Sequence, residues 1–275
     1  MQREIVPRVS VDVGYFRRIY GNFTVTDNLT LGPQDYDPFS VAAPSDSRLP
    51  GGGGYLIEDL YNLNPTSFGL ASNNYVTFAS NYGKQIEHWN GMDVTATARL
   101  QNGLSFSGGL STGRRTEDEC DVAPKLDSPS RRFCHVQEPF LTQVKGFGSY
   151  QIPKIDVNVA ATFQSIPGPS LQANFNATNA MVQPSLGRPL AGGAANVSVA
   201  LLEPNTMYGD RLNQVDLRVG KLFRFYRFRT MASVDVFNVM NANPVLAESS
   251  TYSQWRTPTT ILSARFVKLS LQLDF

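Results

Sequence analysis

The sequence predicts an all-β fold, an antiparallel transmembrane β-barrel with long extracellular loops and short periplasmic turns. Three observations predict it. The last strand alternates apolar and polar residues up to the C-terminus, about eight such segments recur along the chain, and the connections between them alternate between long and short. Antiparallel barrels with one lipid-facing side and one polar lumen have these properties.

The residues from Arg265 to Phe275 form the clearest predicted strand. Apolar residues occupy every second position: Val267, Leu269, Leu271, Leu273 and Phe275. A period of two indicates an extended strand with one apolar face. About ten steps of about 3.3 Å, tilted by about 40°, rise roughly 25 Å, which is the height of the apolar band of an outer-membrane barrel.

Composition excludes other classes of protein. Hydrophobic residues make up 41% of the chain and the mean hydropathy is -0.21. No stretch approaches the roughly 18 apolar residues of a membrane helix. A net charge of +1 argues against a nucleic-acid partner. The chain begins Met-Gln-Arg-Glu-Ile-Val-Pro-Arg without a signal-peptide core, so we expect a fragment of a longer polypeptide.

Pro7 precedes the first predicted strand, in which residues 9, 11, 13 and 15 face outward. Residues from about 18 to 84 contain many breakers and predict a long loop. A hairpin follows, residues 92–100 and 104–111, joined by Asn102-Gly103, a dipeptide favoured in tight turns. Residues 114–138 predict a polar loop.

The remaining predicted strands continue this alternation. Residues 140–150 and 157–163 flank a short turn at Ile152-Pro153-Lys154, and a long irregular region extends to about Arg211. Residues 215–223 and 228–236 flank the third short turn. The facing of residues 228–236 is ambiguous, because Met231 and Phe237 are apolar on the supposed lumen side. Short turns on one side and long loops on the other indicate an outer-membrane topology with both ends periplasmic.

Charged residues on the predicted lumen face are the main candidates for a functional site: Asp93, Arg99, Lys145, Asp156, Arg218, Arg229 and Asp235. They either pair with one another or contact a partner inside the lumen. Cys120 and Cys134 lie in a polar loop and suit a disulfide in an oxidising compartment, since metal binding requires more ligands than two cysteines and His135.

No enzyme motif or cofactor site is predicted. His88 and His135 belong to no recognisable nucleophile motif. The run from Gly51 to Gly54 lacks the Lys-Ser/Thr and the helix of a phosphate loop, which favours a flexible loop tip. Four acidic residues of the first loop could supply calcium ligands, but their spacing matches no EF-hand and favours a solvated loop: Asp27, Asp35, Asp37 and Asp46.

Several stretches resemble one known family. Gly209-Asp-Arg-Leu-Asn-Gln-Val-Asp-Leu-Arg218, Val234-Asp-Val-Phe-Asn-Val-Met-Asn-Ala242 and the terminal Phe275 strand resemble the C-terminal end of TonB-dependent outer-membrane receptors. Residues 25–29, 35–39, 47–53 and 140–145 are similar to the large receptors with a carboxypeptidase-regulatory-like N-terminal domain. The likeness covers essentially all of the chain.

The resemblance implies a barrel of about 22 strands with an N-terminal plug, which moves a bulky nutrient inward with energy from the TonB complex. This sequence departs from the family in having no plug, no TonB box and about eight strands. We therefore expect residues 1–275 to be the C-terminal part of such a barrel. The partners are then outer-membrane lipid, the TonB complex through the plug, and an unknown nutrient.

The last strand also matches the C-terminal signal that the outer-membrane assembly machinery recognises, which assigns this role to Leu269, Leu271, Leu273 and Phe275. Two other hypotheses remain open. A small autonomous eight-stranded barrel with an adhesive or structural role has the same topology. A soluble secreted β-domain requires the outward apolar face to pack against a second sheet.

Overall fold

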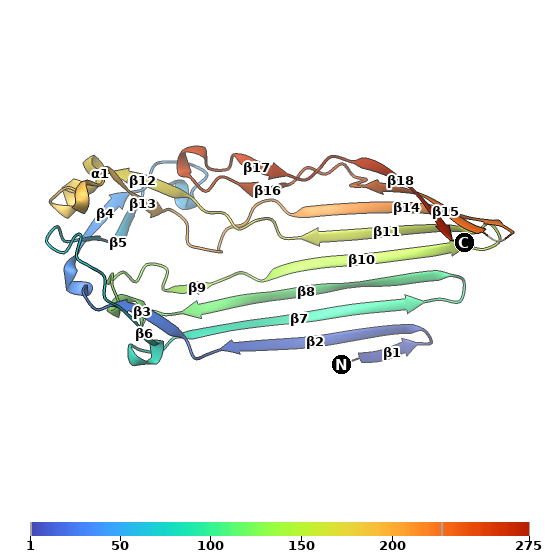
Figure 1. The fold of residues 1–275 in the computed structure, drawn as a ribbon, viewed down its shortest axis with the longest axis horizontal. Helices are drawn as coiled ribbons and strands as arrows, with labels where there is room; N and C mark the ends of the chain where they lie inside the picture. The colour runs from blue at the N-terminus through green and yellow to red at the C-terminus, as the bar shows by residue number, and fades with distance from the viewer. Residues whose placement is uncertain (1, 227, 275) are drawn as a thin grey trace.

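The chain is mostly β and forms one large antiparallel sheet of ten strands, with long connections gathered at one end (Figure 1). The computed structural model describes residues 2–226 and 228–274. Nine strands follow one another across the sheet: β1 (Gln2–Val6), β2 (Val9–Tyr20), β7 (Ile86–Arg99), β8 (Leu104–Asp118), β10 (Leu141–Ile152), β11 (Val157–Ile166), β14 (Leu212–Phe225), β15 (Phe228–Phe237) and β18 (Phe266–Asp274). The tenth, β9 (His135–Gln137), pairs with β8.

All eight strands expected from the sequence are present, and two more join them. β1 is missed because Gln-Arg-Glu-Ile-Val has no alternation of apolar and polar residues, and β9 is only three residues long. β7 and β8 also extend further toward the loops than expected. Their added residues are mostly polar on both faces, with Ile86 the one large aliphatic side chain among them, so backbone pairing continues where the apolar alternation has ended.

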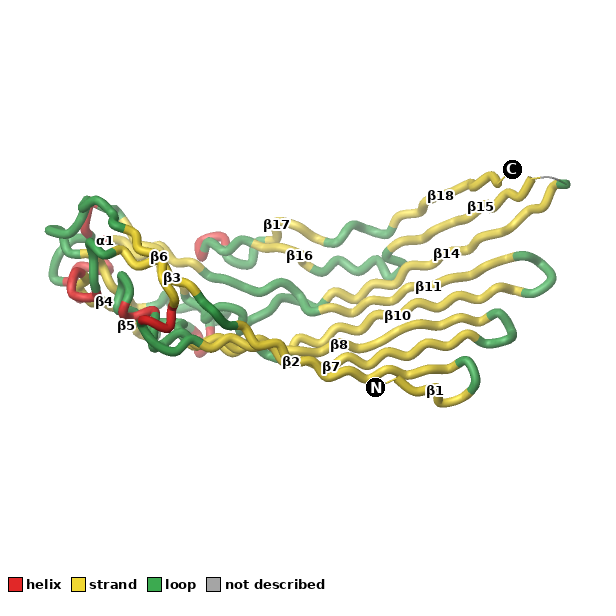
Figure 2. Tube along the Cα trace, turned by 60° about the horizontal axis from the view of Figure 1, so that its bottom comes forward, coloured by secondary structure: helices red, strands yellow, loops and turns green. Residues whose placement is uncertain are grey.

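The sheet is open. Among the described residues, β1 and β18 each pair with one neighbour and form its two edges. This chain therefore does not close the barrel that the sequence predicts. Every strand pair in the sheet is antiparallel, and Figure 2 shows the short turns at one end and the long connections at the other.

The register places every second residue of the eight long strands on one common face. Val13 pairs with Val94, which pairs with Leu110, and Val144 continues this row. At the other side of the sheet Val219 pairs with Val234, which pairs with Leu269. We call this the apolar face. Met231 and Phe237 lie on the opposite, polar face, which resolves the facing that the sequence left ambiguous.

The apolar face is exposed along its whole width. Side chains that remain at least a third accessible include Tyr15, Phe106, Val219, Leu269 and Leu271. No second sheet among the described residues covers them, because the remaining strands form four short hairpins at the loop end. An apolar surface this wide is unusual for a soluble monomer.

The four long connections together form a cap at one end of the sheet, comprising residues 21–85, 119–140, 167–211 and 238–265. Its hairpins are β3 (Thr24–Asn28) with β6 (Asn74–Phe78), β4 (Tyr36–Ala42) with β5 (Leu56–Leu63), β12 (Asn174–Thr178) with β13 (Asn196–Ala200), and β16 (Val245–Glu248) with β17 (Pro258–Ile261). One α-helix, α1 (Asn179–Leu186), and six single 3-10 turns complete it: Pro33–Asp35, Pro50–Gly52, Ala79–Asn81, Ala123–Lys125, Ala191–Gly193 and Tyr252–Gln254.

The buried apolar cluster of the described chain lies in this cap and not between sheet layers. Val41, Leu171, Val182 and Val199 are at most 2% exposed, and Trp255 is 3% exposed. They come from the first, third and fourth connections, which the sequence predicts as irregular loops. No described helix is long and apolar enough to cross a membrane.

The four short turns are displaced in one direction along the sheet. At each turn, one row of paired residues can be followed across the neighbouring strands to β14. The four rows meet β14 at four different residues: Leu217, Val219, Lys221 and Phe225. From residue 217 to residue 225 this stagger accumulates over six strand-to-strand steps. At about 3.3 Å per residue and about 4.8 Å between strands, it corresponds to a strand tilt of roughly 40°.

Because the cap has its own core, we expect Leu171→Ala to destabilise it by about 2–5 kcal/mol, the usual cost of a cavity at a fully buried leucine. Denaturant unfolding followed by Trp255 emission, in a Trp89→Phe background, measures this. The control is Leu29→Ala, a 56% exposed cap residue whose truncation should cost no more than about 0.5 kcal/mol. Equal effects of the two substitutions would contradict a cap core.

Candidate functional site

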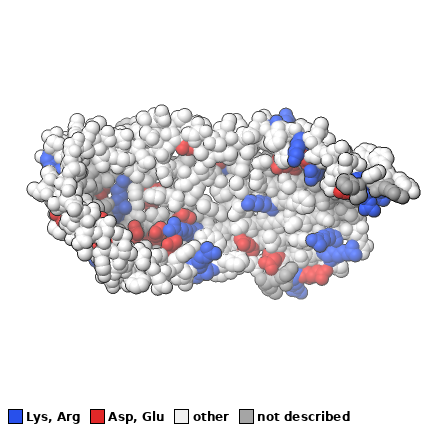
Figure 3. Space-filling model, viewed as in Figure 1, with Lys and Arg blue, Asp and Glu red and all other residues white. Residues whose placement is uncertain are grey.

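The polar face of the sheet carries most of the charged residues that the sequence singles out. Figure 3 shows charged side chains of both signs spread over the strands on this side. Six of the seven candidates occupy polar-face positions of the register: Asp93, Arg99, Lys145, Arg218, Arg229 and Asp235. Asp156 lies instead in the turn between β10 and β11, where its φ is 49° and its carboxylate pairs with Arg224 at 3.0 Å.

Arg218 and Asp235 form the best-defined ion pair of this face. Their cross-strand positions bring the guanidinium Nε within 2.7 Å of the carboxylate. Asp235 is 6% exposed, so it requires a partner to offset the loss of solvation. Lys268 occupies the next cross-strand position on β18, directly opposite Asp235. Positive charge therefore flanks this carboxylate on both neighbouring strands.

Two adjoining hollows mark the centre of the polar face. One of about 330 Å³ is lined by Phe147, Thr162, Asp216, Arg218 and Lys268, among others. The second, of about 460 Å³, shares Phe147, Thr162 and Asp216 with it and reaches Lys145. A hollow of this size accepts protein side chains or a small ligand. Mixed aromatic and charged walls suit a polar partner that also offers apolar contact.

Asp216 and Lys268 belong to this centre, although the sequence does not single them out as site residues. The signal is present: both alternate with apolar residues of strands whose facing the sequence predicts correctly. Asp216 accepts hydrogen bonds from Gln214 at 2.8 Å and from the Asn238 backbone at 2.8 Å. It therefore links β14 to the end of β15.

Toward the cap the polar face ends in an aromatic and ionic group. The indole of Trp89 lies flat against the backbone, because a Cβ at either Gly91 or Gly113 would approach its ring within 2.2 Å. Arg115 lies between two carboxylates, at 2.9 Å from Glu87 and 2.9 Å from Glu117. The Trp89 ring and this ion-pair cluster therefore lie side by side on the polar face, where the sheet meets the cap.

Polar contacts between connections hold the cap together. Arg188 of the third connection pairs with Asp37 of the first at 2.7 Å. Arg48 of the first donates to the Trp255 carbonyl of the fourth at 3.2 Å, and its guanidinium lies 5.4 Å from the centre of a Trp255 ring. Asp127 of the second accepts from the Asn28 backbone at 3.3 Å. Each long connection is therefore fixed by another.

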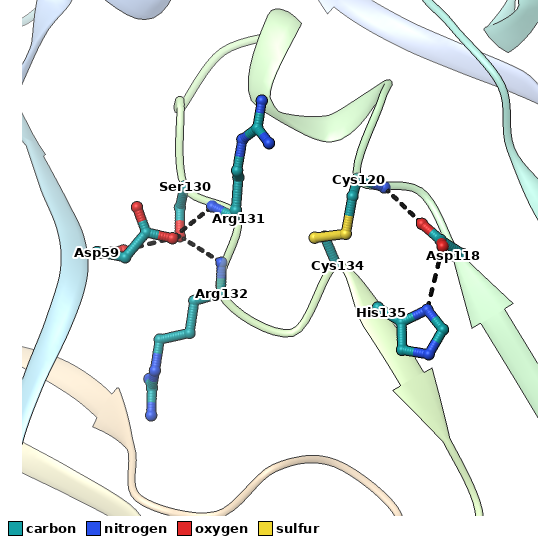
Figure 4. Close-up of a disulfide and its surroundings, with 8 residues drawn as sticks. All are labelled: Asp59, Asp118, Cys120, Ser130, Arg131, Arg132, Cys134 and His135. Atoms are coloured by element: carbon teal, nitrogen blue, oxygen red, sulfur yellow. Dashed lines mark hydrogen bonds and ion pairs between the residues drawn. A yellow bond between two sulfur atoms is a disulfide. The ribbon is translucent and has the colours of Figure 1, made fainter.

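Cys120 and Cys134 form a disulfide within the second connection (Figure 4). The loop it closes contacts β5, where the Asp59 carboxylate accepts from the Arg131 backbone at 2.5 Å. Arg132 donates to the Ala200 carbonyl of β13, and burial lowers the pKa of this guanidinium. The disulfide loop thus bridges the first and third connections of the cap.

The acidic residues of the first connection form hydrogen bonds and ion pairs with other residues of the cap. Asp35 accepts from Ser67 at 2.7 Å, and Asp46 pairs with Arg48 at 2.7 Å. Tyr82 donates to Asp27, which raises the pKa of Tyr82 to about 12. Across the described residues, no group of three or more metal-binding side chains comes together. These contacts account for the acidic residues that the sequence weighed as calcium ligands.

The glycine run forms a tight return of the backbone. Gly51, Gly52, Gly53 and Gly54 all have φ between 65° and 83°, a region that glycine adopts without strain. A Cβ at Gly53 would lie 2.0 Å from the Pro44 carbonyl oxygen. The run follows Pro50 in a 3-10 turn and is joined to β5, not to an α-helix. It therefore differs from a phosphate loop, which leads into a helix.

The two histidines lie apart from the polar centre. His88 is a residue of β7 on the apolar-face side of the register. His135 of β9 contacts Asp118 at 3.1 Å and its side chain is 54% exposed. Of the predicted assembly signal, Leu269, Leu271 and Leu273 lie on the apolar face with 76%, 66% and 61% exposure. Phe275 lies outside the described residues.

Comparison with known proteins gives no assignment. A scan against models of protein families finds no match, and no curated protein matches the chain. The functional interpretation therefore depends on the two faces of the sheet, on the cap, and on the stretches of sequence described above.

Asp46, Arg48, Tyr252 and Trp255 form a joint between the first and fourth connections, through the hydrogen bonds and the ion pair among them. We expect these contacts to break in acid. The side chain and backbone N–H of Arg48 hold the pKa of Asp46 far below its ordinary value, with Tyr252 contributing a hydrogen bond of 3.1 Å. Folding depresses this pKa, so the carboxylate stabilises the cap above the ordinary value of about 3.9, and the contribution is lost as the pH falls below it. We expect Trp255 emission in a Trp89→Phe background to shift to the red in that range.

In Asp46→Asn the contribution is already missing at neutral pH, so the red shift should be present at pH 7 and the acid transition should shrink. Asp210→Asn is the control, since no described residue donates a hydrogen bond to the Asp210 side chain. An unchanged acid transition in Asp46→Asn would show that Asp46 does not control the joint.

Proposed function

We propose that this chain is the C-terminal barrel segment of a TonB-dependent outer-membrane receptor that takes up a bulky nutrient. The observation that carries the proposal is the exposed apolar face of a sheet whose other face is charged. Eight long strands at about 4.8 Å spacing give this surface a width of roughly 40 Å. Lipid is the environment in which such a surface is stable without a second protein layer.

The stagger of the short turns supports a barrel. Strands of a closed barrel tilt relative to its axis, and the register shifts by a fixed amount from strand to strand. A tilt of roughly 40° lies within the range of outer-membrane barrels. A flat soluble sheet does not require its turns to shift in one direction from strand to strand. The stagger therefore favours a barrel over such a sheet.

The open edges support a segment of a larger barrel over an autonomous one. A small barrel requires its first and last strands to pair, whereas β1 and β18 are separate edges here. Unpaired edges of long strands are costly in a membrane, because their N–H and C=O groups find no water. The proposal places the missing strands, and a plug domain, elsewhere in the polypeptide.

A soluble secreted domain is the less favoured alternative. It requires a second sheet against residues such as Leu269 and Leu271, and the described strands outside the main sheet are all part of the cap. The cap already has its own buried core. Nothing in the described part of the chain is therefore left to cover the apolar face.

The stretches that carry the family resemblance contact one another in space. Arg218 of the first stretch pairs with Asp235 of the second, and Asp216 accepts from the Asn238 backbone. The Asn238 side chain, 2% exposed, donates to the carbonyls of Ala242 at 2.7 Å and Ser263 at 2.9 Å. Together they fix β14, β15 and the approach to β18.

In this receptor the polar face lines the interior. Its hollows around Phe147 and Asp216 then face the plug, and the cap faces the exterior, where ligand arrives first. The TonB complex acts through the plug and not through this segment. The nutrient itself is bound by surfaces that the cap and the plug share.

The size of the native polypeptide tests the proposal. An antibody against residues 266–274, applied to outer membranes of the source cell, should detect a band several times larger than 30.3 kDa. The control is the inner-membrane and soluble fractions of the same cells, which should give no signal. A band near 30 kDa would instead establish an autonomous barrel and exclude the transport function for this chain.

Deletion of Phe275 tests the assembly signal. A missing terminal aromatic should reduce the amount of polypeptide inserted in the outer membrane, because the assembly machinery no longer recognises the last strand. Quantitative blotting of membrane fractions measures the loss. Phe275→Tyr, which keeps an aromatic ring, is the matched control; normal insertion of the deletion variant would refute the signal role.

A further inference from the structure

The apolar face is almost free of charge on its eight long strands. Among its described positions only four residues are charged: Arg17, Arg114, Asp118 and Lys221. Lys221 lies near the short turns, where its ammonium reaches back to the Ile155 carbonyl at 2.6 Å. Asp118 lies at the cap end and contacts His135. Two arginines remain, both at the border between apolar face and cap.

Arg17 and Arg114 lie in one row across three strands. Arg17 of β2 pairs with Asn90 of β7, and Asn90 pairs with Arg114 of β8. Two strand spacings separate the arginines by about 10 Å at the backbone. On the next row toward the short turns, Tyr15 donates its hydroxyl to the Asn90 side chain at 3.2 Å. In this row Asn90 therefore lies between the two arginines.

Neither arginine has an acidic partner among the described residues. The guanidinium of Arg114 lies 4.8 Å from the centre of the Phe140 ring, and no carboxylate is within salt-bridge distance of either side chain. On the polar face, by contrast, Arg115 and Arg218 both have carboxylate partners. The pair at the border is therefore available to an external anion.

A hollow of about 570 Å³ lies on the same face, closer to the short turns. Glycines at outward positions create it: Gly108, Gly146 and Gly148. Phe106 and Phe163 border it, and Val94 and Leu110 lie at its cap-side end, in the strands that carry Asn90 and Arg114. Leu110 is four residues from Arg114, which is about 13 Å along a strand.

We propose that these two features bind one anionic membrane lipid, with its phosphate between Arg17 and Arg114 and an acyl chain in the glycine hollow. The inference rests on the proposed function, since it requires lipid at the apolar face. Guanidinium groups match phosphate oxygens in geometry and charge. The charged row lies at the border of the apolar band, which is the level of lipid headgroups, and the hollow lies where acyl chains run.

Binding of a defined lipid tests the site. The intact polypeptide, purified in a neutral detergent, is titrated with dioleoyl phosphatidic acid and with dioleoylglycerol, which lacks the phosphate. The wild type should prefer the phosphatidic acid, and Arg17→Gln with Arg114→Gln should weaken its binding by about tenfold or more. Arg8→Gln with Arg131→Gln removes the same charge elsewhere and should leave binding unchanged.

A separate substitution, Gly146→Leu, tests whether the hollow binds the acyl chain. A Cβ at Gly146 meets only the Phe106 ring, at 4.0 Å, so Gly146→Leu fits the backbone and fills the hollow. This substitution should weaken the binding of phosphatidic acid and of dioleoylglycerol to the same extent. Far-UV circular dichroism checks that each variant keeps the sheet. Equal binding of phosphatidic acid by the wild type and the double arginine variant, or no binding by the wild type, would overturn the proposal.

Two further results separate the possible failures. Competition by inorganic phosphate at the concentration of the lipid would show an anion site without lipid, and would overturn the lipid assignment. A polypeptide that is monodisperse without detergent would contradict the proposed membrane location itself. A polypeptide that requires detergent but shows no preference for phosphatidic acid would contradict only the lipid site.

Discussion

Antiparallel backbone pairing in one continuous register is the constraint on which this structure depends. Because side chains alternate along a strand and paired residues share a face, one register error would move a strand's apolar residues to the charged side. The rows through Val94 and Leu110, and through Val219 and Leu269, show the same facing at both sides of the sheet. The amphipathic sheet follows from this agreement.

A sheet without a second layer must find its stability elsewhere. The described chain buries its apolar cluster in the cap, where Leu171 and Trp255 are nearly inaccessible, and leaves the apolar face of the sheet open. Lipid at that face supplies the missing contact in the proposed receptor. The disulfide at Cys120 and the joint at Asp46 then hold the long connections outside the membrane, where water competes for their hydrogen bonds.

The two faces divide the proposed functions. The polar face offers charge and hollows around Asp216 and Phe147 to an interior partner, while the border of the apolar face offers Arg17 and Arg114 to an anionic lipid. Alternation on a single strand produces both, since neighbouring residues of β8 point to opposite sides. Substitutions on one face therefore leave the other face unchanged, so the two proposed functions can be tested separately.

The sequence by itself determined the eight long strands of the sheet, their facing except for residues 228–236, and the sides of the long and short connections, because alternation with period two is a local property. It placed Arg218 and Asp235 among seven lumen-face charges, but it did not indicate that these two pair with each other. The tertiary structure decided what depends on contacts between distant segments. These are the edge strand β1, the open sheet, the stagger of the turns, the turn position of Asp156, and the packed cap in which loops without periodicity bury Val41 and Leu171.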